Sequence, residues 1–151
     1  AAPLTPDEIA QRAAAEHKRR AEEAERMRQL RLDQALLETY RSVQDLDSRR
    51  DRELRELDRS IRELRARESE LIERQRVMID EATHTDKSDV AASLEADIRL
   101  LDSEIAAQSS VVAAKLRERN AVVERFEEHR RRYVELTSAP ESARIPPMPR
   151  R

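Results

Sequence analysis

Residues 54–82 read LRELDRSIRELRARESELIERQRVMIDEA, and this stretch decides the fold. Its apolar residues recur at alternating steps of three and four, as in Leu57, Ile61 and Leu64. This spacing is the heptad pattern of a helix that packs against another helix. Acidic residues also precede basic ones by four positions, as in Asp58 and Arg62, which stabilises a solvated helical face. The stretch therefore predicts a long helix with one apolar seam.

The polar heptapeptide Thr83–Asp89 follows this stretch, and a second apolar seam follows the heptapeptide. Folding the chain at residues 83–89 places Met78 opposite Leu94 and Leu71 opposite Leu101. We therefore expect an all-α fold, a long antiparallel two-helix coiled-coil hairpin with arms at 36–82 and 90–137. The residues expected in its seam are Leu36, Tyr40, Val43, Leu54, Leu57, Ile61, Leu64, Leu71, Met78, Leu94, Ile98, Leu101, Ile105, Val112, Leu116, Val123, Phe126, Tyr133 and Leu136.

Residues 5–35 predict an alanine-rich, charged helical overhang that is continuous with the first arm. Thr5 stands at the N-cap, Pro6 at the first helical position and Glu8 in capping-box position. The hairpin offers this overhang nothing to pack on, so its apolar residues are candidates for contact with a partner. These are Ile9, Ala13, Met27 and Leu30. We expect a disordered start at residues 1–4 and a disordered Pro- and Arg-rich tail at residues 138–151.

The composition of the 151 residues excludes several classes of protein. Charged residues make up 41% of the chain, aromatic residues 2%, and glycine and cysteine are absent. Sheets are disfavoured, because tight hairpin turns favour glycine, which is absent, and strands favour aromatic residues, which are few. Without cysteine there is no disulfide and no thiolate metal ligand. A net charge of −2 opposes nucleic-acid binding, and no apolar run is long enough to span a membrane.

No residue pattern indicates catalysis, a cofactor or a metal. The nearest candidate is His84 with Glu81, Asp86 and Asp89. A single histidine with mobile carboxylates is a poor metal site, so we expect these residues to form a solvated loop. The sequence shows no nucleophile–base pair and no glycine loop for phosphate. We therefore expect a protein that is not an enzyme.

Two blocks of the sequence resemble uncharacterised coiled-coil proteins of proteobacterial cell envelopes. The first is Leu36-Leu37-Glu38-Thr39-Tyr40 with Val43, Asp45-Leu46 and Arg49-Arg50-Asp51-Arg52; the second is Arg125-Phe126 with Arg132-Tyr133-Val134-Glu135-Leu136. The resemblance extends over residues 36–136, and Thr83–Asp89 departs from the glycine- and proline-containing loop of those proteins. It implies a coiled-coil fold and a periplasmic location, and it carries no activity.

These observations predict a non-enzymatic periplasmic scaffold or adaptor that acts through helix–helix interaction with a protein partner or with itself, as a homodimer. The opening residues Ala1–Pro6 are typical of what a cleaved signal peptide leaves behind. A cytoplasmic location is the alternative. The protein would then be an adaptor similar to the helical-hairpin stalk proteins of flagellar and type III export ATPases. A holdase-like chaperone is a further alternative, which the polar turn disfavours.

Overall fold

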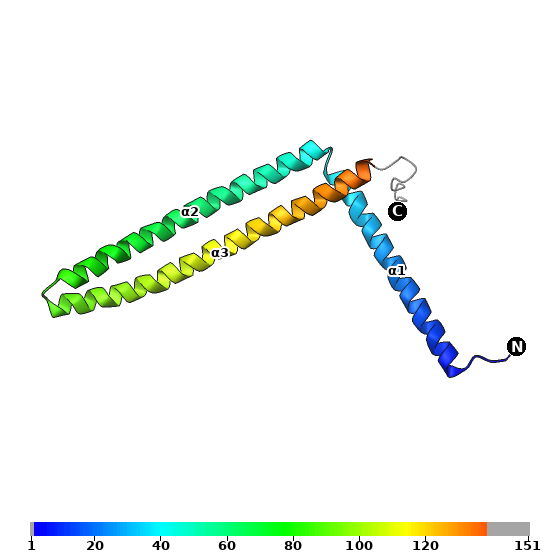
Figure 1. The fold of residues 1–151 in the computed structure, drawn as a ribbon, viewed down its shortest axis with the longest axis horizontal. Helices are drawn as coiled ribbons and strands as arrows, with labels where there is room; N and C mark the ends of the chain where they lie inside the picture. The colour runs from blue at the N-terminus through cyan, green and yellow to red at the C-terminus, as the bar shows by residue number, and fades with distance from the viewer. Residues whose placement is uncertain (1, 139–151) are drawn as a thin grey trace. The chain divides into compact units, whose positions relative to one another are not determined.

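The computed structural model describes residues 2–138, which form three α-helices and no strand. The helices are α1 (Pro6–Thr39), α2 (Val43–His84) and α3 (Ser88–Ser138) (Figure 1). The prediction of an all-α fold is confirmed. Ala1 and residues 139–151, which include nearly all of the predicted tail, lie outside the described residues.

The start of α1 has the predicted cap. The Glu8 amide donates to Thr5 Oγ1 at 3.2 Å, and the Thr5 amide donates to Glu8 Oε2 at 3.3 Å. This reciprocal pair satisfies two of the amides that a helix N-terminus leaves without an intrahelical acceptor. Asp7 and Glu8 add negative charge to the first turn, where the helix dipole favours it. The predicted capping box is confirmed.

The helix predicted to run unbroken from residue 5 through the first arm is instead interrupted at Tyr40–Ser42. Tyr40 is extended, with φ −111° and ψ 136°, and α2 begins at Val43. The Asp45 amide donates to Ser42 Oγ at 3.0 Å, and the Arg41 amide donates to Asp45 Oδ2 at 3.0 Å. Serine and aspartate compete in this way for backbone hydrogen bonds that would otherwise continue a helix. The sequence Ser42-Val43-Gln44-Asp45 is a capping signal that produces a new helix start here.

We expect Ser42→Ala to lower the free energy of unfolding by about 1 kcal/mol, because the Asp45 amide loses its side-chain acceptor. Urea denaturation followed by the helical circular dichroism signal measures this change. Ser48→Ala is the matched control, since Ser48 is exposed inside α2 and alanine favours helix. Equal losses in both variants would contradict the capping role of Ser42.

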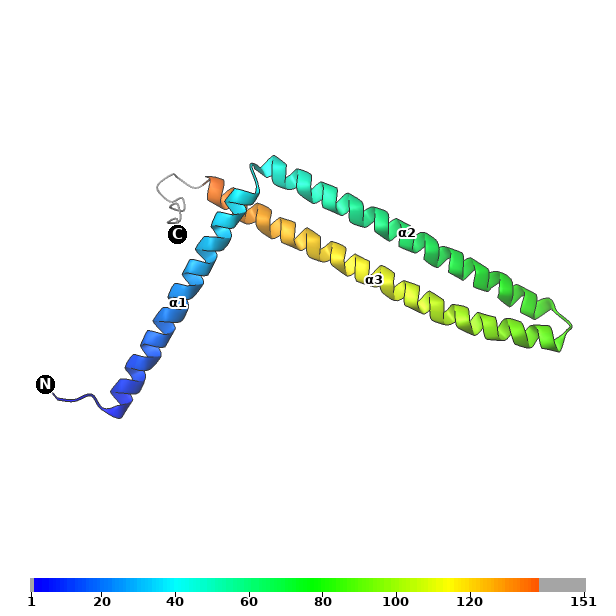
Figure 2. The same ribbon diagram turned by 180° about the vertical axis from the view of Figure 1, so that it is seen from behind.

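The chain divides into two compact units. The first contains the residues up to Leu46 and those from Glu128 onward, and the second is Asp47–Glu127. In the second unit, α2 and α3 lie side by side and are joined by residues 85–87 (Figures 1 and 2). The connection is therefore shorter than the predicted turn at 83–89, because α2 continues to His84 and α3 begins at Ser88.

The turn at residues 85–87 forms without glycine and, across residues 2–138, no residue has a positive φ angle. In the last turn of α2, Thr83 Oγ1 donates to the Ile79 carbonyl at 2.8 Å. The Thr85 amide donates to the Glu81 carbonyl at 3.0 Å, and the Lys87 amide donates to Thr85 Oγ1 at 3.3 Å. The end of α2 is thus closed by a backbone hydrogen bond to Glu81, without a residue in the left-handed conformation.

Polar contacts tie α2 to α3 in the second unit. Gln108 Nε2 donates to the Leu64 carbonyl at 2.9 Å, and Gln75 Nε2 donates to the Ile98 carbonyl at 3.1 Å. Arg119 and Asp58 form an ion pair at 2.6 Å, which lowers the pKa of the Asp58 carboxyl, chiefly through the hydrogen bond from Arg119. These bonds fix the register of the two helices, because each links one particular pair of positions.

Candidate interaction surfaces

The predicted seam residues all lie at buried or partly buried positions, and none of them is exposed. Two buried apolar residues were missed. Leu46 is fully buried at 0% exposure, and Val122 is buried more deeply than the predicted Val123. Counting back from Leu57 in steps of four, three and four reaches Leu46, so the heptad pattern could have identified it. Counting forward from Val112 in steps of three, four and three likewise reaches Val122. The choice of Leu116 and Val123 instead requires a stutter, which is an irregular step in the heptad repeat.

In the first unit, two tyrosines hold the break between α1 and α2. The Tyr133 hydroxyl donates to the Tyr40 carbonyl at 3.2 Å, and this bond is buried. The two rings meet edge to face, with their centroids 6.3 Å apart, a favourable geometry for aromatic pairs. His129 Nδ1 lies 3.4 Å from the Tyr40 hydroxyl. The carbonyl that α1 leaves open at its end thus has a specific donor from α3.

A half-buried ion pair lies close to this break in the sequence. Arg132 donates to both carboxylate oxygens of Asp33, at 2.8 Å from Nε and 2.6 Å from Nη2. Asp33 is only 3% exposed, and Gln29 Nε2 also donates to it at 2.9 Å. The hydrogen bonds from Arg132 lower the pKa of the Asp33 carboxyl in spite of burial, and the pKa of Arg132 is raised in return. The pair joins α1 to α3 within the first unit.

The four predicted partner-contact residues of α1 differ in exposure. Ile9 and Ala13 are exposed, whereas Met27 and Leu30 are partly covered. From residue 6 to residue 26, every residue except Glu16 is exposed. The first half of α1 is therefore a helix without a covering surface among the described residues.

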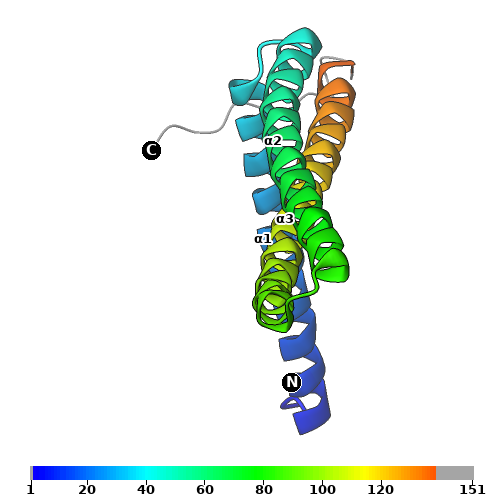
Figure 3. The ribbon, with the colours of Figure 1, turned by 90° about the vertical axis from the view of Figure 1, so that its left-hand side faces the viewer.

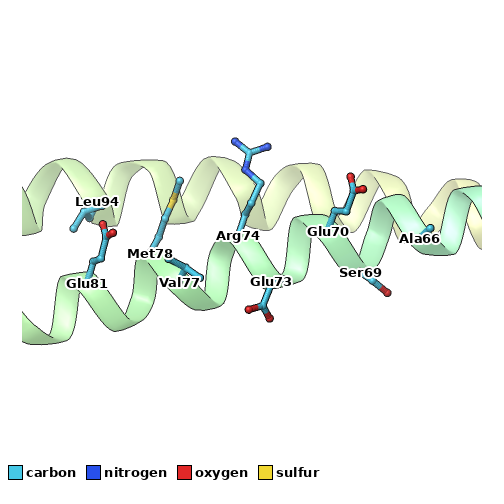
Figure 4. A pocket seen from close by; sticks show the side chains of 9 residues that line it. All are labelled: Ala66, Ser69, Glu70, Glu73, Arg74, Val77, Met78, Glu81 and Leu94. Atoms are coloured by element: carbon cyan, nitrogen blue, oxygen red, sulfur yellow. The ribbon is translucent and has the colours of Figure 1, made fainter.

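An open groove of about 870 Å³ lies between α2 and α3 near their connection (Figure 4). Its lining is Ala66, Ser69, Glu70, Glu73, Arg74, Val77, Met78 and Glu81 from α2, with Leu94 from α3. Figure 4 shows Met78 and Leu94 side by side at one end of the groove. The groove combines apolar side chains with a charged rim, a composition that suits a protein surface better than a small polar ligand.

The prediction that Glu81, His84, Asp86 and Asp89 form a solvated loop is wrong for three of them, because Glu81 and His84 lie in α2 and Asp89 lies in α3. His84 Nδ1 bonds the Asp80 carbonyl of its own helix at 2.8 Å. Within residues 2–138, no group of three or more histidine, aspartate or glutamate side chains is arranged to hold a metal ion. None of the described helices combines the length and apolarity needed to cross a membrane.

No protein-family model matches this chain, and the curated proteins and the solved structures give no significant match either. The geometry of its own residues is therefore the basis for assigning a function.

Proposed function

We propose that this protein is a non-enzymatic scaffold or adaptor that binds another protein through helix–helix contacts. In this proposal α1 is the recognition helix, and α2 with α3 forms an antiparallel coiled-coil hairpin that supports it. The observation that carries the proposal is the exposure of α1 from residue 6 to residue 26. A helix that buries its apolar residues against a groove of a partner is a common mode of recognition.

The exposed half of α1 is stabilised by contacts of its own. Glu16 forms ion pairs with Arg19 at 2.7 Å and Arg20 at 3.0 Å, and Glu23 pairs with Arg26 at 2.8 Å. Each such exposed pair contributes little, but together they favour helix. A segment that is helical before binding loses less conformational entropy when it docks. Ile9 and Ala13 lie one helical turn apart and provide its apolar surface.

The coiled-coil part of the proposal rests on the seam between α2 and α3. Heptad positions such as Leu57, Ile61, Leu71 and Leu101 are buried, and the two helices exchange sides along the hairpin when viewed from its end (Figure 3). Such wrapping is what a heptad repeat favours. In this role the hairpin would act as a spacer with a fixed register.

A periplasmic location belongs to the proposal and is supported by the resemblance of residues 36–136 to envelope coiled-coil proteins. Fractionation of the native organism, with detection by antibody, tests it. Recovery with periplasmic marker proteins is the expected result, and recovery with cytosolic markers would favour the adaptor of a cytosolic export ATPase instead.

A photo-crosslinking amino acid placed at Ala13 of the full chain tests the recognition role of α1. In the native organism we expect a discrete adduct with one protein, because Ala13 lies on the exposed apolar side of α1. The same substitution at Ala15 is the matched control, since two positions along a helix is a rotation of about 200°.

A charge introduced on the side of α1 that carries Ile9 and Ala13 also tests the recognition role of this helix. With the photo-crosslinking amino acid kept at position 13, Ile9→Glu is expected to abolish the adduct, whereas Gln11→Glu, which adds equal charge to another face, leaves it unchanged. Both positions are exposed, so each variant is expected to keep the fold. Equal adducts at Ala13 and Ala15, or none at either, would contradict a recognition role for this helix.

A further inference from the structure

The end of the hairpin nearest the turn contains no buried residue. Leu71 and Leu101 are buried, but every residue from 72 to 100 is partly or fully exposed. Five large apolar side chains in this interval are 39–64% exposed, namely Ile72, Val77, Ile79, Val90 and Leu100. Two helices alone therefore leave much apolar surface in contact with water here, and Val77 among these five side chains lines the groove described above.

The end of the groove nearest the turn has an apolar centre between two opposite charges. Val77 and Met78 form the centre, Arg74 precedes it by one turn, and Glu81 follows it by one turn. Figure 4 shows Arg74 and Glu81 on either side of Met78.

The charges that line the groove differ in their partners. Glu70 pairs with Arg67, and Glu73 pairs with Arg76. Among the described residues, Arg74 and Glu81 form no ion pair. The groove thus offers one unpaired base and one unpaired acid.

The spacing of these residues is self-complementary. If a second copy packs its α2 against the first in the opposite direction, with a two-fold axis between positions 77 and 78, positions equally far from the axis face each other. Arg74 of each copy then faces Glu81 of the other, and Val77 faces Met78. This single arrangement forms two ion pairs between Arg74 and Glu81 and covers the apolar centre of both grooves.

We propose that this groove is the contact surface for a second copy of the chain, which docks α2 against α2 to form a two-fold symmetric dimer. This rests on the proposed function in that both assign the protein to helix–helix recognition, but it uses α2 rather than α1. An unrelated protein in the groove would not place an acid opposite Arg74 and a base opposite Glu81 by symmetry, as a second copy does.

Charge reversal tests the pairing directly in the full chain. In Arg74→Glu, the introduced glutamate faces Glu81 of the other copy at both contacts, and in Glu81→Arg, two arginines face each other at both contacts. We expect each variant alone to dimerise about tenfold or more weakly, because two exposed ion pairs become two repulsions. An equimolar mixture of the two variants pairs opposite charges at both contacts and is expected to dimerise like the original protein.

Sedimentation equilibrium over a concentration series measures these constants, and circular dichroism checks that each variant keeps its helix content. Glu56→Arg and Arg59→Glu are matched controls on exposed sites of α2, about 20 Å or more from Arg74 along the helix. Dimers in the original protein and the controls, weak dimers in each single variant and recovery in the mixture support the proposal. A monomeric original protein, or dimers insensitive to positions 74 and 81, would overturn it. Crosslinking at Ala13 tests the proposed function separately, since it does not depend on this dimer.

Discussion

Leu46→Ala is expected to lower the free energy of unfolding by about 3 kcal/mol. Leu46 has no exposed surface, and no other side chain in residues 2–138 is as completely buried among the large residues. It lies in the first turn of α2, four positions after Ser42. Truncation to alanine removes buried apolar area and leaves a cavity beside the break between α1 and α2.

Urea denaturation followed by circular dichroism measures the loss. Leu32→Ala is the matched control, because Leu32 is the same residue type at 52% exposure, and its expected cost is below about 0.5 kcal/mol. Leu46→Met keeps most of the volume and should cost less than about 1.5 kcal/mol. Similar losses for Leu46→Ala and Leu32→Ala would show that the packing around Leu46 is absent in solution.

The second large effect is expected for Arg132→Gln, which removes both guanidinium hydrogen bonds to the Asp33 carboxylate. The carboxylate is then buried without its counter-charge, a condition that destabilises proteins by about 3–5 kcal/mol when both partners are fully buried. The Arg132 side chain is 37% exposed, so solvent screens the pair and we expect about 2 kcal/mol.

Arg131→Gln is the control for Arg132→Gln. Arg131 is the neighbouring residue, is 64% exposed and pairs only with exposed glutamates, so its loss should be at most about 0.5 kcal/mol. A double-mutant cycle with Asp33→Asn isolates the coupling between the two side chains. A coupling energy close to zero would contradict the ion pair as a source of stability.

The dependence of stability on pH gives an independent measure of the Asp33–Arg132 pair. The pKa of Asp33 is lowered in the folded protein, first by its hydrogen bonds from Arg132. The stability that this carboxylate contributes is therefore fully present above its unfolded pKa of about 3.9 and is lost as the pH falls through the folded pKa. The difference in free energy of unfolding between the original protein and Asp33→Asn should shrink below about pH 4. A difference that stays constant down to low pH would contradict this linkage.

Sequence patterns were sufficient for the helical character of the chain. The capping box at Thr5 and Glu8 uses residues three positions apart, so local sequence contains all the information needed. The break at Tyr40 also had a local signal in Ser42 and Asp45, but the absence of glycine and proline around it favoured a continuous helix. Propensity alone does not decide whether a capping signal inside a helical pattern is used.

Other features depend on contacts between distant residues. Asp33 and Arg132 are 99 positions apart. From the sequence alone, each is predicted to be a charged residue on a solvated helical face. The unpaired charges at Arg74 and Glu81 could not be recognised for a related reason. Glu70 stands four positions before Arg74 and predicts an ion pair with it, whereas Glu70 pairs with Arg67 instead. Which of several neighbouring arginines a glutamate chooses depends on side-chain packing.

The hydrogen bond from the Tyr133 hydroxyl to the Tyr40 carbonyl has a consequence for the order of folding. It joins residues 93 positions apart, whereas the bond from Gln75 to the Ile98 carbonyl spans 23. Closing the longer loop first would cost about 1.2 kcal/mol more in chain entropy. A hairpin can zip from its turn, yet the interval nearest this turn has no buried residue to stabilise an early intermediate. We therefore expect refolding to be limited by the joining of the distant ends, so that Leu46→Ala slows refolding in stopped-flow measurements more than Met78→Ala does.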